Sequence, residues 1–149
     1  MFKHVLVTLD GSPRAECVMP HAIDIARSMS ADLTLLRIVD AVNSDWSERG
    51  ALGKYHANAT AGSLFAEQAQ SYLERVAAQA RSSGATVHTL VKQGAAAKQI
   101  VATAKEVEAD AIAMATHSRR GVSRLMFGSV AEEVLHQSIL PILLVRSDK

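Results

Sequence analysis

The chain of 149 residues has the length of one domain, and hydrophobic residues make up 48% of it, enough to build a folded core. Its 16 basic and 15 acidic residues give a net charge of +1, which argues against a general nucleic-acid binder because such proteins carry a strong basic excess. It holds no run of about 18 apolar residues, so we expect no segment that spans a membrane.

The start of the chain predicts a strand, a tight turn and a helix. The β-rich run over 5–9 ends at Asp10-Gly11, which is a turn signal. Ser12-Pro13 follows, and this pair is typical of a helix N-terminus. Pro20 lies inside the helix that comes next, so we expect it to kink or reset that helix early.

The rest of the chain alternates between short apolar runs and amphipathic stretches. The apolar runs do not alternate with polar residues, which is typical of strands buried on both faces of a parallel sheet. We expect strands at 33–39, 86–91, 111–115 and 139–146, an irregular polar segment at 40–59, and helices at 60–82, 95–107 and 128–137. Strands that alternate with helices imply right-handed crossovers. The sequence therefore predicts an α/β fold with a single doubly wound five-stranded parallel sheet and helices on both faces.

Cysteine use and the first residues bear on the compartment. Cys17 is the only cysteine, so no internal disulfide can form and a reducing compartment fits. The opening 1–7 is too short and too soon interrupted for a signal peptide, and it is typical of a strand. We therefore expect a cytoplasmic protein.

Two strand-to-helix junctions have unusual sequences, at 8–12 and at 115–130. In doubly wound sheets, ligands bind outside the carboxyl ends of the strands. The second junction carries three arginines and ends at Gly128-Ser129, where the last helix starts. A helix N-terminus offers free N–H groups and partial positive charge, so this junction could capture an anion. The alternative is that Gly128-Ser129 only makes a tight helix start.

These segments resemble the universal stress protein family. The similarity lies in 114–121 (MATHSRRG) followed by 128–132 (GSVAE), in the opening 5–12 (VLVTLDGS) and in the ending 141–145 (PILLV). It covers essentially the whole chain, so residues 1–149 are identified as a single universal stress protein domain. The resemblance implies the adenine nucleotide alpha-hydrolase-like fold.

The resemblance also implies an ATP site. In the nucleotide-binding branch the loop reads G-x2-G-x9-G-[S/T], and this chain keeps the spacing with Ala115 and Ser118 at the first two glycine positions. By this resemblance the adenine and ribose end would contact Thr8, Asp10, Val39, Met114 and Ala115. The phosphates would be held by Ser118, Gly128, Ser129 and Val130, and Mg²⁺ would bind to the phosphates.

Other interpretations of the same residues stay open. Asp10 could simply cap its own turn, and Met114 and Val39 could be core residues. Arg119, Arg120 and Arg124 could face solvent or the rim of a dimer, or they could contact phosphate.

The last strand suggests a partner. A terminal apolar strand at a sheet edge is a template for pairing with another chain. The resemblance implies a homodimer through Ile142, Leu143, Leu144 and Val145, and such two-fold contacts are the commonest kind. The alternative is an internal strand fully covered by helices.

No enzymatic machinery stands out in the sequence. We find no nucleophile elbow, P-loop or dinucleotide fingerprint, and the six histidines show no metal-ligand spacing. The resemblance implies a stress-response protein that binds ATP and acts as a homodimeric regulatory module, and the lack of catalytic motifs leads us to expect that it is not an enzyme, with slow ATP hydrolysis left open. The alternative function is a dimeric interaction module of the same fold that binds no nucleotide.

Overall fold

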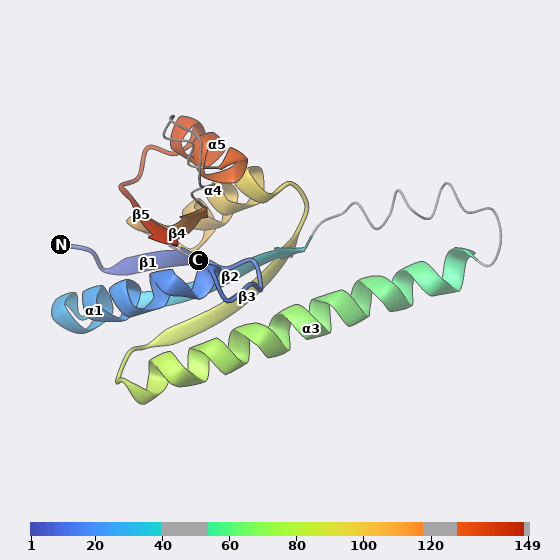
Figure 1. Cartoon of the computed structure of the whole chain (residues 1–149), viewed down its shortest axis with the longest axis horizontal. Helices are drawn as coiled ribbons and strands as arrows, with labels where there is room; N and C mark the ends of the chain where they lie inside the picture. The colour runs from blue at the N-terminus through green and yellow to red at the C-terminus, as the bar shows by residue number, and fades with distance from the viewer. Residues whose placement is uncertain (40–53, 118–127, 148–149) are drawn as a thin grey trace.

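Five parallel strands form the centre of the molecule (Figure 1). The computed structural model describes residues 1–39, 54–117 and 128–147, with the side chains of 54–63 and 117 left out. The strands are β1 (His4–Thr8), β2 (Asp32–Val39), β3 (Val87–Gln93), β4 (Ala111–His117) and β5 (Ile142–Ser147). They lie in the order β3-β2-β1-β4-β5, and every neighbouring pair is parallel. The predicted doubly wound sheet is confirmed.

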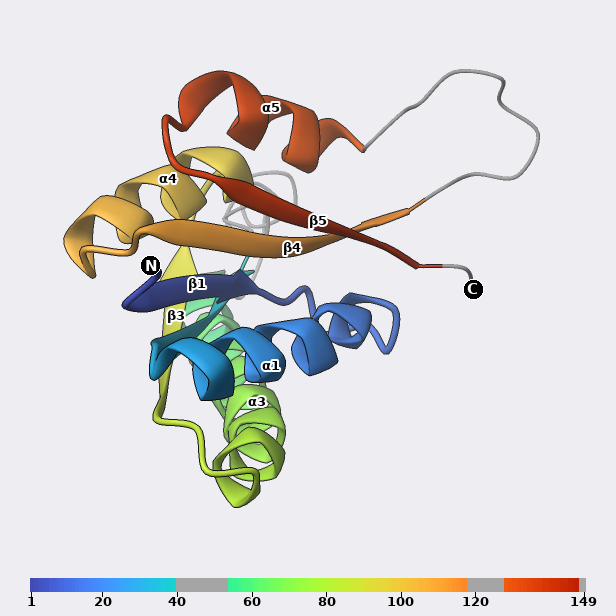
Figure 2. The ribbon, with the colours of Figure 1, turned by 90° about the vertical axis from the view of Figure 1, so that its left-hand side faces the viewer.

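Helices cover both faces of this sheet, and the two views agree on their arrangement (Figures 1 and 2). One face carries the short 3-10 helix η1 (Ala15–Val18), α1 (Met19–Met29) and α3 (Lys54–Ser82). The other face carries α4 (Ala96–Glu106) and α5 (Ser129–Gln137). Because each helix returns the chain to the amino edge of the sheet, every strand ends at the same edge.

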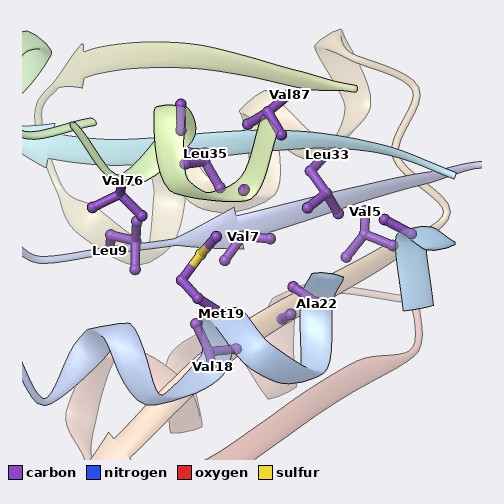
Figure 3. Close-up of a cluster of buried hydrophobic side chains, with 14 of the residues drawn as sticks. Val5, Val7, Leu9, Val18, Met19, Ala22, Leu33, Leu35, Val76 and Val87 are labelled. Atoms are coloured by element: carbon purple, nitrogen blue, oxygen red, sulfur yellow. The ribbon is translucent and has the colours of Figure 1, made fainter. Parts of the chain in front are cut away.

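Two hydrophobic clusters hold the layers together, one on each face. Successive strand side chains point to opposite faces, so Val7 and Leu35 pack under α1 and α3, whereas Leu6, Leu36 and Ile112 pack under α4 and α5. Figure 3 shows the first cluster, in which side chains of β1 and β2 meet side chains of α1 and α3. Burial on both faces explains why the strands are apolar without alternation.

The first helix differs in detail from the prediction. Ser12 and Pro13 lead into the 3-10 helix η1, and α1 starts only at Met19. Pro20 therefore lies in the first turn of α1, where its missing N–H has no helical acceptor to lose. The expected reset at Pro20 is confirmed. Cys17 is half-buried.

The long helix α3 starts earlier than expected. It includes residues 54–59, which we had expected to be irregular because they are polar. Those residues contain no Gly or Pro to end a helix, and two alanines and a lysine among them favour one. Leu64 in this helix is 51% exposed. Among the described residues, no helix is both long and apolar enough to cross a bilayer.

The last strand starts later than expected, at Ile142 instead of Ile139. The Ser138 hydroxyl accepts a hydrogen bond from the Leu140 N–H at 3.1 Å, and Pro141 has no N–H to give to a ladder. Ile139 is consequently in a turn and is 97% exposed. The strand itself lies at one edge of the sheet, as expected.

Contacts between side chains and backbone anchor the amino edge and α3. Arg81 of α3 donates to the Val87 carbonyl through Nε and Nη2, at 3.1 and 2.7 Å. Its Nη1 also donates to Glu74, which accepts a 2.6 Å hydrogen bond from the Thr89 hydroxyl. These bonds hold the C-terminal half of α3 against β3.

Asp110 joins the amino ends of β1 and β4. Its carboxylate accepts hydrogen bonds from the N–H groups of Lys3 and His4, at 2.8 and 3.1 Å. Desolvation by burial would raise the pKa of Asp110, but these backbone hydrogen bonds outweigh it and hold the pKa below its usual value. The charged carboxylate is therefore the form that the fold stabilises.

We predict that Asp110→Ala lowers the free energy of unfolding by about 1 kcal/mol at neutral pH, because two backbone donors lose their acceptor. The folded-state pKa is depressed, so the contribution is present above the unfolded pKa of about 3.9 and is lost as pH falls toward the folded pKa. Urea unfolding from neutral pH down to about pH 2 measures this. Asp24→Ala, an exposed position on α1, is the control. A gap between Asp110→Ala and the unmutated protein that does not narrow in acid would contradict the assignment.

Candidate functional site

The candidate site lies at the carboxyl edge of the sheet, next to β1, on whose two sides the strand order runs in opposite directions. From β1 the chain moves to β2 and β3 on one side, and then crosses back to β4 and β5 on the other. The topological switch point therefore lies between β1 and β4, whose residues Val7 and Ala113 are register partners. Crevices for ligands form outside such points.

Asp10 lies in the turn that follows β1. Leu9 before it is buried, which fixes the chain, and Asp10 itself is exposed. Its Oδ1 accepts hydrogen bonds from the Ser12 N–H at 2.8 Å and the Ser12 hydroxyl at 2.5 Å. The Ser12 hydroxyl oxygen in turn accepts from the Ala15 N–H at 3.3 Å. Asp10 thus caps its own turn, and its carboxylate is also held at the carboxyl edge.

The strand residues predicted for the site reach this same edge. Thr8 is the last residue of β1, is half-buried, and is the register partner of Leu36. Val39 ends β2, three residues beyond Leu36, and is half-buried. Met114 on β4 is only 4% exposed and belongs to the cluster under α4 and α5, so its core interpretation holds for most of its side chain.

Ala115 stands at a glycine position of the family loop, yet its backbone needs no glycine. It lies within β4, is half-buried and is the register partner of Val145. The described non-glycine residues with positive φ are Ser30 and Glu108, so Ala115 has an ordinary extended conformation. Alanine therefore adds no backbone strain at this position.

Gly128 opens α5 with a backbone that favours glycine. Its φ and ψ are 87° and 150°, a region that side chains other than glycine rarely adopt. No side chain of the described residues caps the helix start, and the Gly128 carbonyl accepts a hydrogen bond from the Glu132 N–H at 3.0 Å. Ser129 is exposed and Val130 half-buried at the first two helical positions. Because β4 and β5 are parallel, α5 starts at the carboxyl edge, with its unsatisfied amides and positive dipole end there.

Part of the predicted loop lies outside the described residues. Ser118, Arg119, Arg120 and Arg124 belong to this part. The other predicted residues, Thr8, Asp10, Val39, Met114 and Ala115, lie toward the same carboxyl edge of the sheet as the start of α5. Among the residues whose side chains are described, no three of His, Cys, Asp and Glu lie where they could share a metal ion.

Sequence reasoning missed Arg37, which lies beneath the turn after β1. Gly11 has a φ of +87°, and a Cβ built on it would lie 2.7, 2.8 and 2.9 Å from Cζ, Nη2 and Nη1 of Arg37. Three similar distances mean that the guanidinium presents its flat face to Gly11. The signal was a single charged residue within the buried run 33–39 (LTLLRIV).

Tyr72 of α3 supports Arg37 from the other element. The Arg37 guanidinium carbon lies 5.2 Å from the centre of the Tyr72 ring, and that of Arg75 lies 5.3 Å from it. Both distances fit cation–π contacts. Arg75 also forms a 3.0 Å ion pair with Glu16 of η1. The ring therefore links β2, α3 and η1 beside the Asp10 turn.

The Tyr72 hydroxyl stays neutral in this setting. Burial, followed by the nearby carboxylates of Glu16 and Asp10, raises the pKa of Tyr72 to about 12, while Arg75 and Arg37 oppose the rise. The oxygen is buried and has no hydrogen-bond partner in the described part of the chain. Tyr72 is therefore neutral over the whole physiological pH range, and its ring contacts both guanidinium groups in this neutral form.

The predicted dimer residues form the β5 edge. Ile142, Leu143, Leu144 and Val145 are all half-buried. Leu143 and Val145 pack on the α1–α3 side, and the other two pack on the α4–α5 side. One long side of β5 pairs with β4, and within the described residues no strand pairs with its other side.

Comparisons with known proteins find a family match over nearly the whole chain. The sequence profile of the universal stress protein family matches residues 1–146. A universal stress protein of Methanocaldococcus jannaschii is 31% identical over 149 residues, which is 100% of this chain and 85% of that protein.

Solved structures share the fold. The hypothetical protein MJ0577, whose structure was used to assign its biochemical function, superposes with a TM-score of 0.83 at 23% identity, over 100% of this chain and 99% of the other. A universal stress protein in complex with cAMP gives 0.67 at 21% identity, over 99% and 98%. The protein of Archaeoglobus fulgidus in complex with dAMP gives 0.65 at 20% identity, over 97% and 98%.

Proposed function

The chain belongs to the universal stress protein family, and from this premise we propose that it binds an adenine nucleotide, ATP, at the carboxyl ends of β1 and β4 and acts as a homodimeric regulatory protein. The phosphates would lie against the start of α5, with Gly128, Ser129, Val130 and Ser118. The adenine and ribose would lie toward Thr8, Asp10, Val39, Met114 and Ala115.

The observation that carries this proposal is the pairing of two opposite kinds of binding group at one edge. The Asp10 carboxylate only accepts hydrogen bonds, so it suits the hydroxyl or amine donors of a nucleoside. The α5 start only donates, so it suits phosphate. A nucleotide carries both groups on one molecule. Two structures with this fold were solved with adenine nucleotides, cAMP and dAMP, which supports the same ligand class here.

The chain's own residues would bind and orient the nucleotide, without chemistry. Mg²⁺ would bind to the phosphates, because it prefers phosphate oxygens and water to an all-protein cage. We propose that ATP is held intact, because Oδ1 of Asp10 is occupied by the Ser12 N–H and hydroxyl, and this pair serves to shape its own turn.

We predict that Mg-ATP stabilises the protein and that the α5 start is responsible. At an ATP concentration 100 times Kd, the unmutated chain should gain about 2.7 kcal/mol of stability. Ser129→Ala should raise Kd roughly tenfold, because it removes one hydroxyl donor to a charged phosphate. Gly128→Ala should raise it at least as much, because alanine resists the conformation that aims the amides. Calorimetric titration and thermal melting measure both effects.

The matched control for Gly128→Ala is Gly84→Ala. The two glycines have φ values of +87° and +91°, and a Cβ at either would meet no described atom within 4 Å. Gly84 lies between α3 and β3, at the opposite edge of the sheet, so its variant should lose stability but keep the ATP affinity. No binding at millimolar ATP by the unmutated chain would favour the ligand-free interaction module instead. Phosphate release that Asp10→Ala or Ser129→Ala abolishes would show an ATPase.

The homodimer is proposed on the character of the β5 edge. Its four apolar residues are half-buried although the strand is a sheet edge, and unpaired edges invite pairing with another chain. Leu135 and Ile139, which precede β5, are 41% and 97% exposed and add apolar surface. A second copy would cover this surface through a two-fold contact.

We predict a solution mass twice the 15.9 kDa of the chain in sedimentation experiments. Val145→Lys should shift the protein toward the monomer, because it places a charge on the proposed interface. The control is Val91→Lys on β3: both valines are half-buried, lie on edge strands and pack against the same cluster. Equal dissociation by both variants, or a monomer at every concentration, would contradict the β5 interface.

A further inference from the structure

We propose that Arg37 is a positioning residue for the nucleotide site, acting through the Asp10–Gly11 turn while Tyr72 holds its guanidinium in place. This inference rests on the proposed function for its ligand. It adds a residue that lies one strand away from the carboxylate it positions.

The first step of the argument is the contact between Arg37 and the turn. The guanidinium occupies the space that any side chain at position 11 would need, at 2.7–2.9 Å from the Cβ position. Gly11 also has positive φ, so glycine is favoured there for two independent reasons. The backbone at Gly11 therefore packs directly on the Arg37 guanidinium, with no room for a side chain between them.

The second step is that, within the described residues, the face of the Tyr72 ring holds the Arg37 guanidinium, and no carboxylate does. Within the described residues Arg37 forms no ion pair, and its guanidinium carbon lies 5.2 Å from the centre of the Tyr72 ring. Tyr72 lies on α3, one turn before Val76, and α3 is fastened to the first cluster and to β3. The guanidinium is thus fixed by β2 and α3, and its contact with Gly11 restrains a turn that is otherwise exposed to solvent.

The third step is what the turn carries. Asp10 precedes Gly11 directly, and its carboxylate orientation is set by hydrogen bonds to Ser12 within the same turn. If the support under Gly11 is removed, the turn can populate other conformations. The apparent Kd equals the intrinsic Kd divided by the fraction of molecules whose turn has the binding conformation. A tenfold drop in that fraction therefore raises the apparent Kd about tenfold.

Two variants, Arg37→Lys and Arg75→Ala, distinguish this positioning role from a simple effect of positive charge. Lysine keeps the positive charge of Arg37 but lacks the planar group that faces Gly11 and stacks on the ring. Arg75 contacts the same ring at nearly the same distance, 5.3 Å, but the three atoms nearest the Gly11 Cβ position all belong to Arg37. Arg75→Ala removes the same charge from the same cluster and is therefore the matched control.

The experiment measures two quantities on Arg37→Ala, Arg37→Lys and Arg75→Ala. In ATP titrations both Arg37 variants should raise Kd about tenfold, and Arg75→Ala should leave it near that of the unmutated chain. In NMR relaxation without nucleotide, the order parameters of the Gly11 and Ser12 amides should fall from about 0.85 toward 0.6 in both Arg37 variants only. Thermal melting checks that each variant is folded.

The outcomes distinguish this inference from the proposed function. An unmutated chain that binds no ATP overturns the proposed function, and the order parameters then decide the role of Arg37 alone. Unchanged order parameters at Gly11 and Ser12 in Arg37→Ala overturn the positioning role. Recovery of affinity by Arg37→Lys, or equal loss in Arg75→Ala, also overturns it, because either result would show that charge is sufficient.

Discussion

The parallel pairing of β1 with both β2 and β4 is the constraint on which the rest of the structure depends. Parallel neighbours need crossovers, and right-handed crossovers in two directions put helices on both faces. Every strand end then reaches one edge, and the switch between β1 and β4 leaves a place there that no crossover covers. The core residues are buried for stability, but their arrangement is what brings Asp10 to the same edge as the start of α5.

Two glycines at this edge solve the same backbone problem in different surroundings. Gly11 and Gly128 both have a φ of +87°. The space beside Gly11 is filled by the Arg37 guanidinium, whereas no described atom lies within 4 Å of the Cβ position at Gly128. The first turn is therefore supported by a side chain of the protein, whereas no atom of the described residues packs on the Cβ position of Gly128 at the helix start. This difference fits the proposed roles: the turn at Gly11 fixes the Asp10 carboxylate, and the helix start at Gly128 receives the ligand.

Local patterns in the sequence were sufficient for the fold and for the two strand-to-helix junctions at which the candidate site is proposed. The apolar runs predicted all five strands, and Asp10-Gly11 and Gly128-Ser129 marked the two turns correctly. Element ends were less predictable because they depend on single hydrogen bonds, as at Ser138 and Leu140 before β5. Arg37 was missed because its function depends on Tyr72, 35 positions away in the printed sequence, and no periodicity reports such a contact. The role of Ser118, which lies outside the described residues, stays a prediction.

The most direct test of the nucleotide site is an NMR titration of the uniformly ¹⁵N-labelled chain with Mg-ATP. The account predicts that amide resonances of Asp10, Gly11, Ser129 and Val130 shift together and saturate at one ATP concentration. Those at the opposite edge, such as Lys3 and Asp110, should stay in place. Saturable shifts confined to that opposite edge, or none at millimolar ATP, would contradict it.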